Sequence, residues 1–354
     1  MAIMKVTPNE FINIVEPLYS SGIEVPTVML WGPPGVGKSE AIRDSLAKRL
    51  AKNTGKRVIF TDVRLLLFNP VDLRGIPVPD KAHEFTQWLK PQIFNLDDSK
   101  DVINLLLLDE ISSAPPTVQA AAYQLTLDRK VGEHSLPDNV IVLAAGNRVV
   151  DKGVAYKMPT PLANRMTHFE IYANLDDWKE WAIPNEIHPV VIGFLNWQQN
   201  RLHSFDPSKD DLAFPTPRSW SFVSKYLKIY NDIDKAYYMI AGTVGEGAAV
   251  EFKAFAKTYG SLPDVQKIMD GEEVQFQQKP DIMYALSASL SSRVGKAKKD
   301  QLKNITKFTM DKLPKEFAVL TMKDILRVPG VKEQIMVMKE WIEWAKKHKN
   351  LIVN

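Results

Sequence analysis

The first half of the chain alternates between short apolar runs and amphipathic stretches. Five runs have the length and composition of buried strands: Thr27–Trp31, Arg57–Thr61, Ile103–Leu108, Val140–Ala145 and Thr167–Ile171. Helical patterns lie between them and begin near Lys38 and near Pro116. Strands that alternate with helices predict an α/β fold with a mainly parallel sheet, covered by helices on both faces.

After about Tyr172 the strand patterns end and apolar residues recur at helical spacing. The predicted helices are Asp176–Ala182, His188–His203, Pro217–Tyr230 and Lys235–Lys257. Gly, Pro and clustered acids make Gly260–Pro280 typical of a linker. Beyond it, five apolar residues predict one face of a final helix: Val331, Ile335, Met338, Ile342 and Ala345. We therefore expect an α/β core (1–172), a helical unit (173–260), and a linker with a helical C-terminal extension (261–354).

Composition sets limits on this picture. The chain has 354 residues, of which 45% are apolar, so it can form two or three units with sizeable cores. It contains no cysteine, which excludes disulfides and thiolate metal sites. The sequence shows neither a signal-peptide pattern nor an apolar run of about 18 residues, and we expect a cytoplasmic protein without a membrane segment.

The charge is unevenly spread. The net charge is +3, yet residues 293–354 contain 15 Lys or Arg and only 7 Asp or Glu. A solvated helical surface is the simpler interpretation, and an anionic partner is the alternative. No two of the histidines have metal-ligand spacing, so we expect no dedicated transition-metal site: His83, His134, His168, His188, His203 and His348.

A glycine-rich segment follows the first predicted strand and precedes a helix. Gly32-Pro-Pro-Gly-Val-Gly-Lys-Ser39 fits the pattern G-x-x-x-x-G-K-[ST], in which backbone N–H groups converge on phosphate oxygens. Lys38 would contact the β- and γ-phosphates of ATP, and Ser39 would ligate Mg²⁺. A glycine-rich surface turn is the alternative. The predicted nucleotide-binding residues are Gly32, Pro33, Pro34, Gly35, Val36, Gly37, Lys38, Ser39 and Glu40.

Two adjacent carboxylates end the leucine-rich strand, in Asn104-Leu-Leu-Leu-Leu-Asp109-Glu110. Ligands of open α/β sheets lie at the carboxyl ends of the strands, so this pair is expected to meet the phosphates. We assign Asp109 to Mg²⁺ and Glu110 to the polarisation of the attacking water. Such pairs also occur at ordinary strand exits. A water-activating glutamate favours hydrolysis over phosphoryl transfer to a small molecule.

Three further polar residues are candidates for the same chemistry. Asn147 ends the apolar strand after Val140 and could order the water, although a Gly-Asn turn is the simpler alternative. Arg218 lies in the first turn of a helix capped by Thr216, where the helix dipole disfavours a cation unless an anionic ligand is near. Arg218 is therefore a candidate γ-phosphate contact, with a solvent-facing arginine as the alternative. Nothing local requires Arg165, which precedes the last predicted strand.

Together these residues resemble the AAA+ superfamily, and specifically the MoxR-like ATPases. The resemblance extends over roughly residues 25–230. The similar stretches are Gly32–Ser39, Asp72–Gly75, Leu108–Pro116, Gln119–Val131 and Leu162–Arg165. Two departures are Ala145-Gly-Asn147-Arg148 and Leu162-Ala-Asn-Arg-Met166, where family members usually show Gln-Asn-Pro and Leu-Asp-Arg-Phe.

The resemblance implies a five-stranded αβα sandwich followed by a helical lid, which work as a homo-oligomeric ring, usually a hexamer. ATP would lie between subunits, where Arg165 would enter the neighbour's site. Asn147 would match the sensor of the fourth strand and Arg218 the sensor of the lid. Arg129 and Arg148 are further interface candidates. Family members also have two insertions, which Val71–Asn95 and Lys130–Asn139 resemble.

Three functions follow as hypotheses. The first is an oligomeric ATPase, with ATP and Mg²⁺, that remodels or activates a protein client, typically beside a protein with a von Willebrand factor A domain. The second is an ATP-driven motor or loader on nucleic acid, which the basic C-terminal segment motivates. The third is a scaffold that binds ATP and barely hydrolyses it, against which the Asp109-Glu110 pair counts.

Overall fold

The computed structural model describes residues 3–23, 25–151, 156 and 158–348. The chain forms two compact units, Met1–Ala173 and Asn174–Asn354. Among the described residues, no helix is long and apolar enough to cross a membrane. The division of the second unit into a lid and an extension stays a prediction.

The first unit is built on a six-stranded sheet in which every pairing is parallel. Its strands, in spatial order, are β1 (Met4–Val6), β10 (Thr167–Ile171), β2 (Val28–Trp31), β9 (Val140–Gly146), β6 (Val102–Asp109) and β3 (Arg57–Arg64). All five predicted strands are present, so the predicted parallel sheet is confirmed. The sixth, β1, extends the expected five-stranded sheet at one edge. Its three residues, of which only Val6 is buried, are too few for a periodic pattern.

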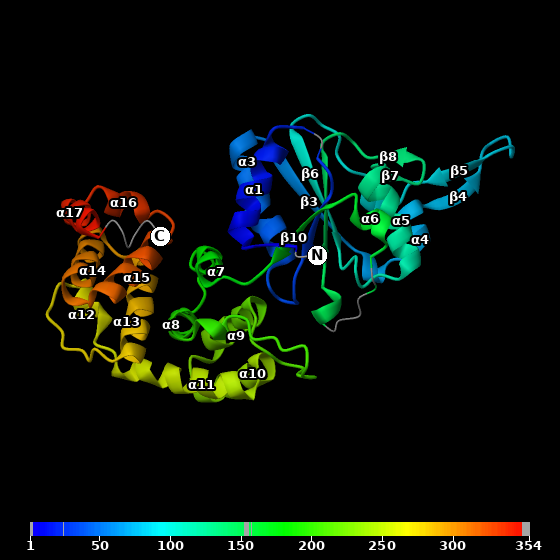
Figure 1. Ribbon diagram of the computed structural model, residues 1–354. Coiled ribbons are helices and arrows are strands. Elements are labelled where there is room, and N and C mark those ends of the chain that lie inside the picture. The colour runs from blue at the N-terminus through cyan, green and yellow to red at the C-terminus, as the bar shows by residue number, and fades with distance from the viewer. Residues whose placement is uncertain (1–2, 24, 152–155, 157, 349–354) are drawn as a thin grey trace. The chain divides into compact units, whose positions relative to one another are not determined.

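Helices cover both faces of this sheet (Figure 1). On one face lie α1 (Pro8–Ser20), η1 (Ala41–Leu46) and α3 (Ala47–Thr54), and on the other α4 (Pro70–Arg74), α5 (Pro116–Leu127) and α6 (Thr160–Ala163). The leucines of β6 alternate between the two layers, because neighbouring strand residues point to opposite faces. A run without polar residues therefore marks a strand buried on both sides.

The order of the strands creates a switch point beside β2. The chain leaves β2 for β3 at one edge, returns through β6 and β9, and then forms β10 on the other side of β2. All six strands are parallel, so their carboxyl ends lie at one edge of the sheet. Ligands of open α/β sheets bind at this edge, where the strand order reverses.

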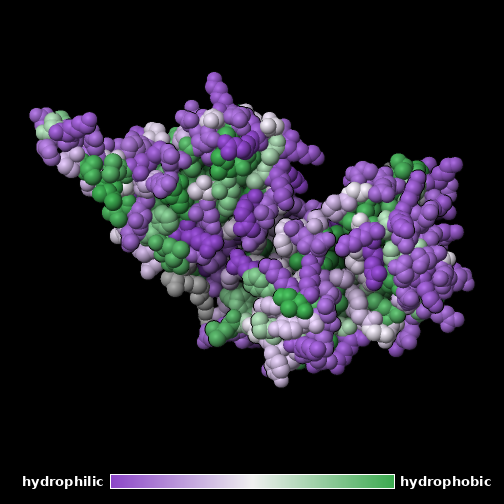
Figure 2. Space-filling view, turned by 180° about the vertical axis from the view of Figure 1, so that it is seen from behind, coloured by the Kyte–Doolittle hydropathy of each residue, from purple (hydrophilic) through white to green (hydrophobic). Residues whose placement is uncertain are grey.

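Both predicted insertions contain a β-hairpin. The first pairs β4 (Ile76–Pro79) with β5 (Thr86–Leu89), and the second pairs β7 (Lys130–Val131) with β8 (His134–Ser135). The hairpins touch each other, since a ring nitrogen of His134 lies 2.7 Å from the carbonyl oxygen of Trp88. The β4–β5 hairpin projects from the unit (Figure 1) and exposes hydrophobic residues (Figure 2), among them Ile76, Phe85 and Leu89.

The second unit is helical throughout its described part. It contains α7 (Leu175–Ala182), α8 (Pro189–Trp197), η5 (Gln199–Arg201), α9 (Pro217–Tyr230), α10 (Ile233–Val244), α11 (Glu246–Lys257), η6 (Thr258–Ser261), α12 (Val265–Met269), α13 (Pro280–Arg293), η7 (Val294–Lys296), α14 (Lys299–Lys312), α15 (Lys315–Leu326), α16 (Lys332–Met336) and α17 (Lys339–Lys347). The predicted helix Pro217–Tyr230 matches α9 at both ends. Its cap, Thr216, accepts a hydrogen bond from the backbone N–H of Ser219.

Two helix predictions were wrong in detail. The stretch Lys235–Lys257 is two helices, because Gly245 has φ +81° and a Cβ there would lie 2.8 Å from the carbonyl oxygen of Ala213. The expected final helix is also two, α16 and α17. In that stripe Ile335 is fully buried but Ile342 is 41% exposed, since the break between the helices turns the second one. The predicted linker contains the short helix α12.

A closed cluster of charged residues lies inside the second unit. The ammonium group of Lys179, on α7, lies 2.9 Å from a carboxylate oxygen of Asp324, on α15, and donates to the amide oxygen of Asn196, on α8. Arg327 bridges Asp324 to Asp176, and both Lys179 and Asp324 are buried. Ion pairs thus join α7 to α15, and the amide of Asn196 connects α8 to both.

Candidate nucleotide site

The glycine-rich turn joins β2 to a helical segment that runs from α2 (Lys38–Glu40) through η1 and α3 to Thr54. Gly32 has φ +155°, and a Cβ there would lie 2.6 Å from the carbonyl oxygen of Ile171. Gly37 has φ +99°, and a Cβ there would meet nothing within 4 Å. The first glycine therefore lets the turn press against β10. The second leaves open space at the start of the helix, where phosphate groups are favoured.

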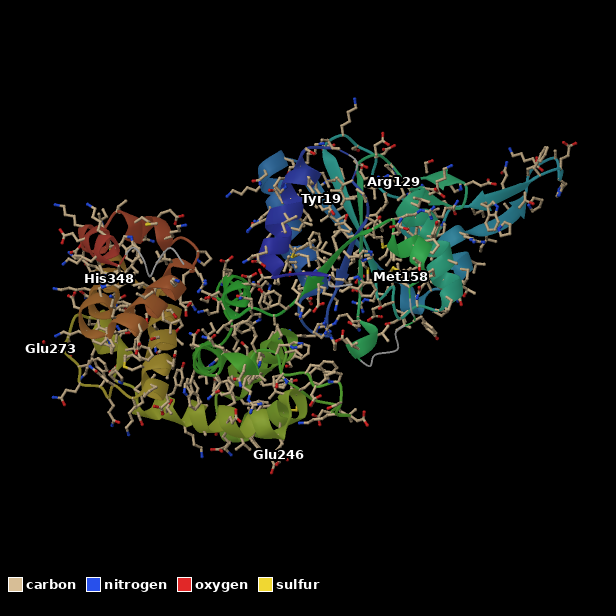
Figure 3. All side chains as sticks on the ribbon, in the orientation of Figure 1. Tyr19, Arg129, Met158, Glu246, Glu273 and His348 are labelled. Carbon is tan, nitrogen blue, oxygen red and sulfur yellow. The ribbon has the colours of Figure 1, made fainter. Side chains whose placement is uncertain are left out.

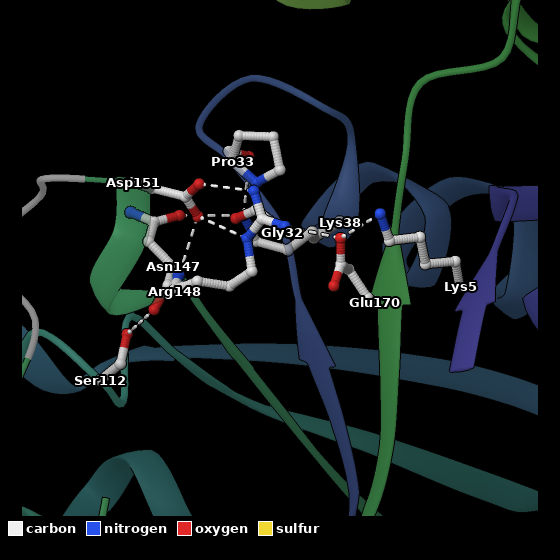
Figure 4. A network of polar contacts seen from close by, with 9 residues as sticks. All are labelled: Lys5, Gly32, Pro33, Lys38, Ser112, Asn147, Arg148, Asp151 and Glu170. Atoms are coloured by element: carbon white, nitrogen blue, oxygen red, sulfur yellow. Dashed lines mark hydrogen bonds and ion pairs between the residues drawn. The ribbon is translucent and has the colours of Figure 1, made fainter. Parts of the chain in front are cut away.

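Lys38 is folded back onto its own turn (Figure 4). Its ammonium group donates to the carbonyl oxygens of Gly32 and Pro33, at 2.7 and 3.1 Å, and to the Oδ1 of Asn147, at 3.1 Å. The side chain is buried although it is charged. Three oxygen acceptors offset the loss of hydration, and they hold the cation at the place where phosphate oxygens would arrive.

The predicted magnesium ligands meet directly. The hydroxyl of Ser39 donates to Oδ2 of Asp109 at 2.7 Å, and Oδ1 of Asp109 accepts from the backbone N–H of Glu110 at 2.9 Å. Glu110 has φ +57°, a rare value for a residue with a side chain. Among the described residues, the Glu110 carboxylate has no hydrogen-bond or ion-pair partner. A hydroxyl and a carboxylate are the hard oxygen donors that Mg²⁺ prefers, so these residues fit that ion.

Asn147 stands at the end of β9, held by the loop that follows the acidic pair. The hydroxyl of Ser112 donates to its carbonyl oxygen at 2.9 Å. At Gly146, just before it, a Cβ would lie 2.6 Å from the same hydroxyl, so a side chain there would displace that hydroxyl. Lys38, Ser39, Asp109 and Asn147 thus lie together at one edge of the sheet, as their positions in the sequence indicated.

Arg148 forms an ion cluster beside Asn147 that the sequence did not indicate. Its guanidinium group binds the Asp151 carboxylate at 2.7 Å and the Glu170 carboxylate at 2.6 Å (Figure 4). Glu170 also pairs with Lys5 of β1, at 3.6 Å. The hydrogen bonds that Arg148 donates to the Asp151 carboxylate raise the pKa of Arg148 above its usual range. Only the three-residue spacing of Arg148 and Asp151 could have indicated part of this cluster, and nothing near Glu170 marks it as a partner.

Two charged residues at the end of β3 border the acidic pair and were also missed. Arg64 is paired in register with Asp109, and its Nε donates to a carboxylate oxygen of Asp62. That hydrogen bond raises the pKa of Arg64. The other oxygen of Asp62 is buried without a partner among the described residues. Neither residue belongs to a recognisable motif, so only the sheet register reveals them.

The remaining predicted arginines are each described within their own unit. Arg165 is exposed, and its guanidinium carbon lies 4.5 Å from the centre of the Tyr123 ring on α5. Arg218 is exposed in the first turn of α9, in the second unit. Arg129, labelled in Figure 3, donates to the carbonyl oxygens of Pro137 and Val140 in its own unit. Glu40 ends α2, directly after Ser39.

No group of three or more His, Asp or Glu side chains in the described ranges is placed to hold a metal ion. The arrangement at the sheet edge instead needs a ligand that brings its own oxygens to Ser39 and Asp109. A parallel sheet whose inner strand enters a glycine-rich turn and then a helix is the arrangement of P-loop proteins.

A family model agrees with this class. Residues 27–168 match the model described as "ATPase family associated with various cellular activities (AAA)". These residues, which are less than half of the chain, are therefore similar to ATPase domains of the AAA family. No curated protein matches the chain.

Three solved structures are similar over most of their lengths. The RuvB Holliday junction branch migration motor of Thermotoga maritima is 16% identical, with 84% of this chain and 86% of that chain covered and a TM-score of 0.38. A candidate ATPase of Cytophaga hutchinsonii is 14% identical, with 98% and 90% covered and a TM-score of 0.35. NtrX of Brucella abortus is 13% identical, with 88% and 67% covered and a TM-score of 0.35.

Proposed function

We propose that this chain hydrolyses ATP as a MoxR-like AAA+ protein. The observation that supports the proposal most is the meeting of four predicted residues at one edge of the sheet. Lys38 donates to Asn147, and Ser39 donates to Asp109, although these partners lie 109 and 70 residues apart in the sequence. Chance proximity at a glycine turn would not bring a cation, a hydroxyl, a carboxylate and an amide together in this order.

Each residue has a distinct task in hydrolysis. Lys38 exchanges the carbonyl oxygens that it now contacts for phosphate oxygens of ATP. Ser39 and Asp109 would hold Mg²⁺, which would supply positive charge to neutralise the phosphates. Glu110, whose carboxylate is unpartnered among the described residues, accepts the proton of the attacking water, and Asn147 orients that water.

Completion of the site by a neighbouring subunit is part of the proposal. Arg165 is exposed and rests on Tyr123 instead of on an acidic side chain, so its charge is available to another molecule. A trans arginine is typically worth about 10³ to 10⁵ in rate. We propose a homo-oligomeric ring, hexameric by resemblance, in which Arg165 reaches the neighbour's γ-phosphate. We also propose that Arg218 is the γ-phosphate contact that the resemblance assigns to the lid.

The client-facing surface of this proposal is the pair of inserted hairpins. Phe85 is 71% exposed, Ile76 62% and Leu89 58%, on a hairpin that buries little of itself. Exposed apolar groups of this kind mark protein interaction surfaces. We propose a protein client, a partner with a von Willebrand factor A domain, as the resemblance implies, and a cytoplasmic location.

A motor on nucleic acid remains the alternative function. The basic C-terminal segment motivated it, but two of those lysines are already paired: Lys303 with Glu340 at 3.3 Å and Lys312 with Glu273 at 3.7 Å. Stimulation of hydrolysis by DNA or RNA, with a steep decrease as salt rises, would favour this alternative.

Measurement of ATP binding and turnover tests the main proposal. We expect purified protein to retain ATP in the presence of Mg²⁺ and to hydrolyse it, and we expect Lys38→Ala to lose both. Lys52→Ala is the matched control, because Lys52 is an exposed lysine farther along the same helical segment. Equal ATP affinity in the wild-type protein and in Lys38→Ala would contradict the proposed site.

A further inference from the structure

We infer that His168 is a positioning residue that connects two turns. One is the glycine-rich turn Gly32–Ser39, called the phosphate turn below, and the other bears Arg165. The inference rests on the proposed function, because it assigns a mechanical task to the arginine that completes a neighbour's site. Three contacts carry it, all within the first unit. They link the last residue of β2, the first residues of β10 and the end of α6.

The connection begins at Trp31, which immediately precedes Gly32. The indole N–H of Trp31 donates to Nδ1 of His168 at 3.0 Å, and the planes of the two rings differ by only 21°, with centroids 6.1 Å apart. Nε2 of His168 lies 2.7 Å from the carbonyl oxygen of Ala163, the last residue of α6. Arg165 is two residues beyond that carbonyl. The path from the phosphate turn to the arginine therefore contains one imidazole ring.

These contacts determine which nitrogen of the His168 ring carries the proton. An indole can only donate, so Nδ1 of His168 must be unprotonated to accept its hydrogen. A carbonyl oxygen can only accept, so Nε2 must carry the proton. The ring is therefore neutral and in one tautomer, and it cannot rotate by half a turn without losing both hydrogen bonds.

The turn bearing Arg165 is fixed at points on either side of the arginine. Leu162 and Met166 are buried in the layer of α5 and α6, on the face of the sheet shown with these helices in Figure 1. The carbonyl oxygen of Ala163 accepts from the backbone N–H of Met166 at 3.2 Å as well as from His168. Arg165 itself projects to solvent beside Tyr123. A shift of the Ala163 carbonyl would therefore move the base of the Arg165 side chain.

The phosphate turn also packs closely against β10. A Cβ on Gly32 would lie 2.6 Å from the carbonyl oxygen of Ile171, three residues after His168. Movement of the turn on nucleotide binding is thus transmitted to β10 at two positions, through Gly32 and through Trp31. Because an error of about 1 Å in a reacting group can cost about 10²-fold in rate, a small shift of the arginine is enough to matter.

Mixed assemblies separate this role from a purely structural one. One chain carries Glu110→Gln, so it cannot hydrolyse ATP but still donates Arg165. The other carries Arg165→Ala, so it can hydrolyse ATP only where a neighbour supplies the arginine. Adding His168→Leu to the donor chain is expected to lower steady-state turnover of the mixture by about 10- to 100-fold. The same change in the acceptor chain should have little effect, and ATP affinity of either chain should be unchanged.

Two conservative variants guard against a folding defect. His168→Gln replaces the ring with an amide that can accept through Oε1 and donate through Nε2, so this donor is expected to restore most of the turnover. Trp31→Phe in the donor keeps an aromatic side chain but removes the indole N–H, with the five-membered ring that carries it, and should act like His168→Leu. Equal turnover with and without His168→Leu in the donor overturns the inference while leaving the ring proposal intact. No turnover in the starting mixture of Glu110→Gln and Arg165→Ala overturns both, since the arginine is then not supplied in trans.

Discussion

The carboxyl edge of the large sheet and the interior of the helical unit both collect charged residues from several elements, and they do so in opposite ways. In the helical unit, Lys179 and Asp324 are buried and satisfied by each other and by Asn196. At the sheet edge, Lys38 is held by carbonyl oxygens that a ligand can replace, and the Glu110 carboxylate is unpartnered in the described ranges.

The difference indicates which of the two charged clusters can bind a ligand. A charge that is buried and fully paired stabilises one conformation and cannot accept a new partner without large loss. A charge whose partners a ligand can replace, such as Lys38, can bind and release that ligand. The two clusters should therefore respond to mutation in opposite measurements, one in turnover and the other in stability.

The largest expected effect concerns Glu110. Glu110→Gln keeps the size of the side chain but removes the base, so kcat should fall by about 10² to 10⁴, the usual contribution of a general base. ATP affinity should stay near the wild-type value, and the free energy of unfolding should change by no more than about 0.5 kcal/mol. Single-turnover hydrolysis and equilibrium ATP binding are the measurements. Unchanged turnover would instead favour a nucleotide-gated scaffold.

The second effect concerns the buried cluster. Asp324→Ala removes the buried carboxylate that pairs with Lys179 and leaves only the exposed Asp176 carboxylate, 3.4 Å from the ammonium group, so it should lower the free energy of unfolding by about 3 to 5 kcal/mol. Denaturant unfolding measures the loss. Asp311→Ala, at an exposed position on α14, is the control and should be near neutral. ATP binding by the first unit should survive Asp324→Ala, and a parallel loss of binding would contradict the separation of the two clusters.

A smaller effect is expected from pH at His188, the cap of α8. Burial, and then the charge of Lys228, lower the pKa of this histidine from 6.5 to about 4. Its Nδ1 accepts from the backbone N–H of Val190, which requires the neutral ring. Between pH 6.5 and about 4 the unfolded chain binds more protons than the folded chain, so stability decreases as pH falls through this range.

With allowance for partial exposure, the loss at His188 should be about 2 kcal/mol between pH 7 and pH 4. His188→Asn keeps a capping side chain without a titrating group. The test is therefore the difference in pH dependence between this variant and the wild-type protein. If the free energies of unfolding of the two proteins change equally with pH across the range, His188 does not contribute to the pH dependence.

The smallest effect is expected at the inserted hairpin. Phe85 is 71% exposed, so Phe85→Ser should change the free energy of unfolding by less than about 0.5 kcal/mol. Basal ATP turnover should also be unchanged. Thermal unfolding of the variant checks the first point, and a loss above about 2 kcal/mol would place Phe85 in a core instead of on a contact surface.

Much of the fold was predictable because its strands are short apolar runs with sharp ends. Thr167–Ile171 was predicted to the residue, and the acidic pair followed from the leucine run before it. The partners of Arg148 were not predictable, because Glu170 lies 22 residues away on a strand whose neighbour is set by topology. The same holds for Lys179 and Asp324, which lie on helices far apart in the chain.

The helix boundaries failed where one residue outweighed a continuing pattern. Lys235–Lys257 keeps its apolar spacing across Gly245, yet the backbone at that glycine cannot be helical. The hairpins were expected only as insertions, since β7 and β8 have two residues each and present no alternation. Short elements of this kind depend on tertiary contacts, such as the one between His134 and Trp88.

The β4–β5 hairpin has a consequence for how the protein behaves at high concentration. Pro77 and Pro79 alternate with Ile76 and Val78, whose N–H groups face β5, so the free border of β4 offers no amide hydrogen at either proline. Another molecule cannot extend the ribbon there strand by strand, which is the usual route to fibrils and precipitates. The exposed apolar side chains of the hairpin can then remain accessible at high protein concentration. A partner that binds them must recognise the shape of these side chains.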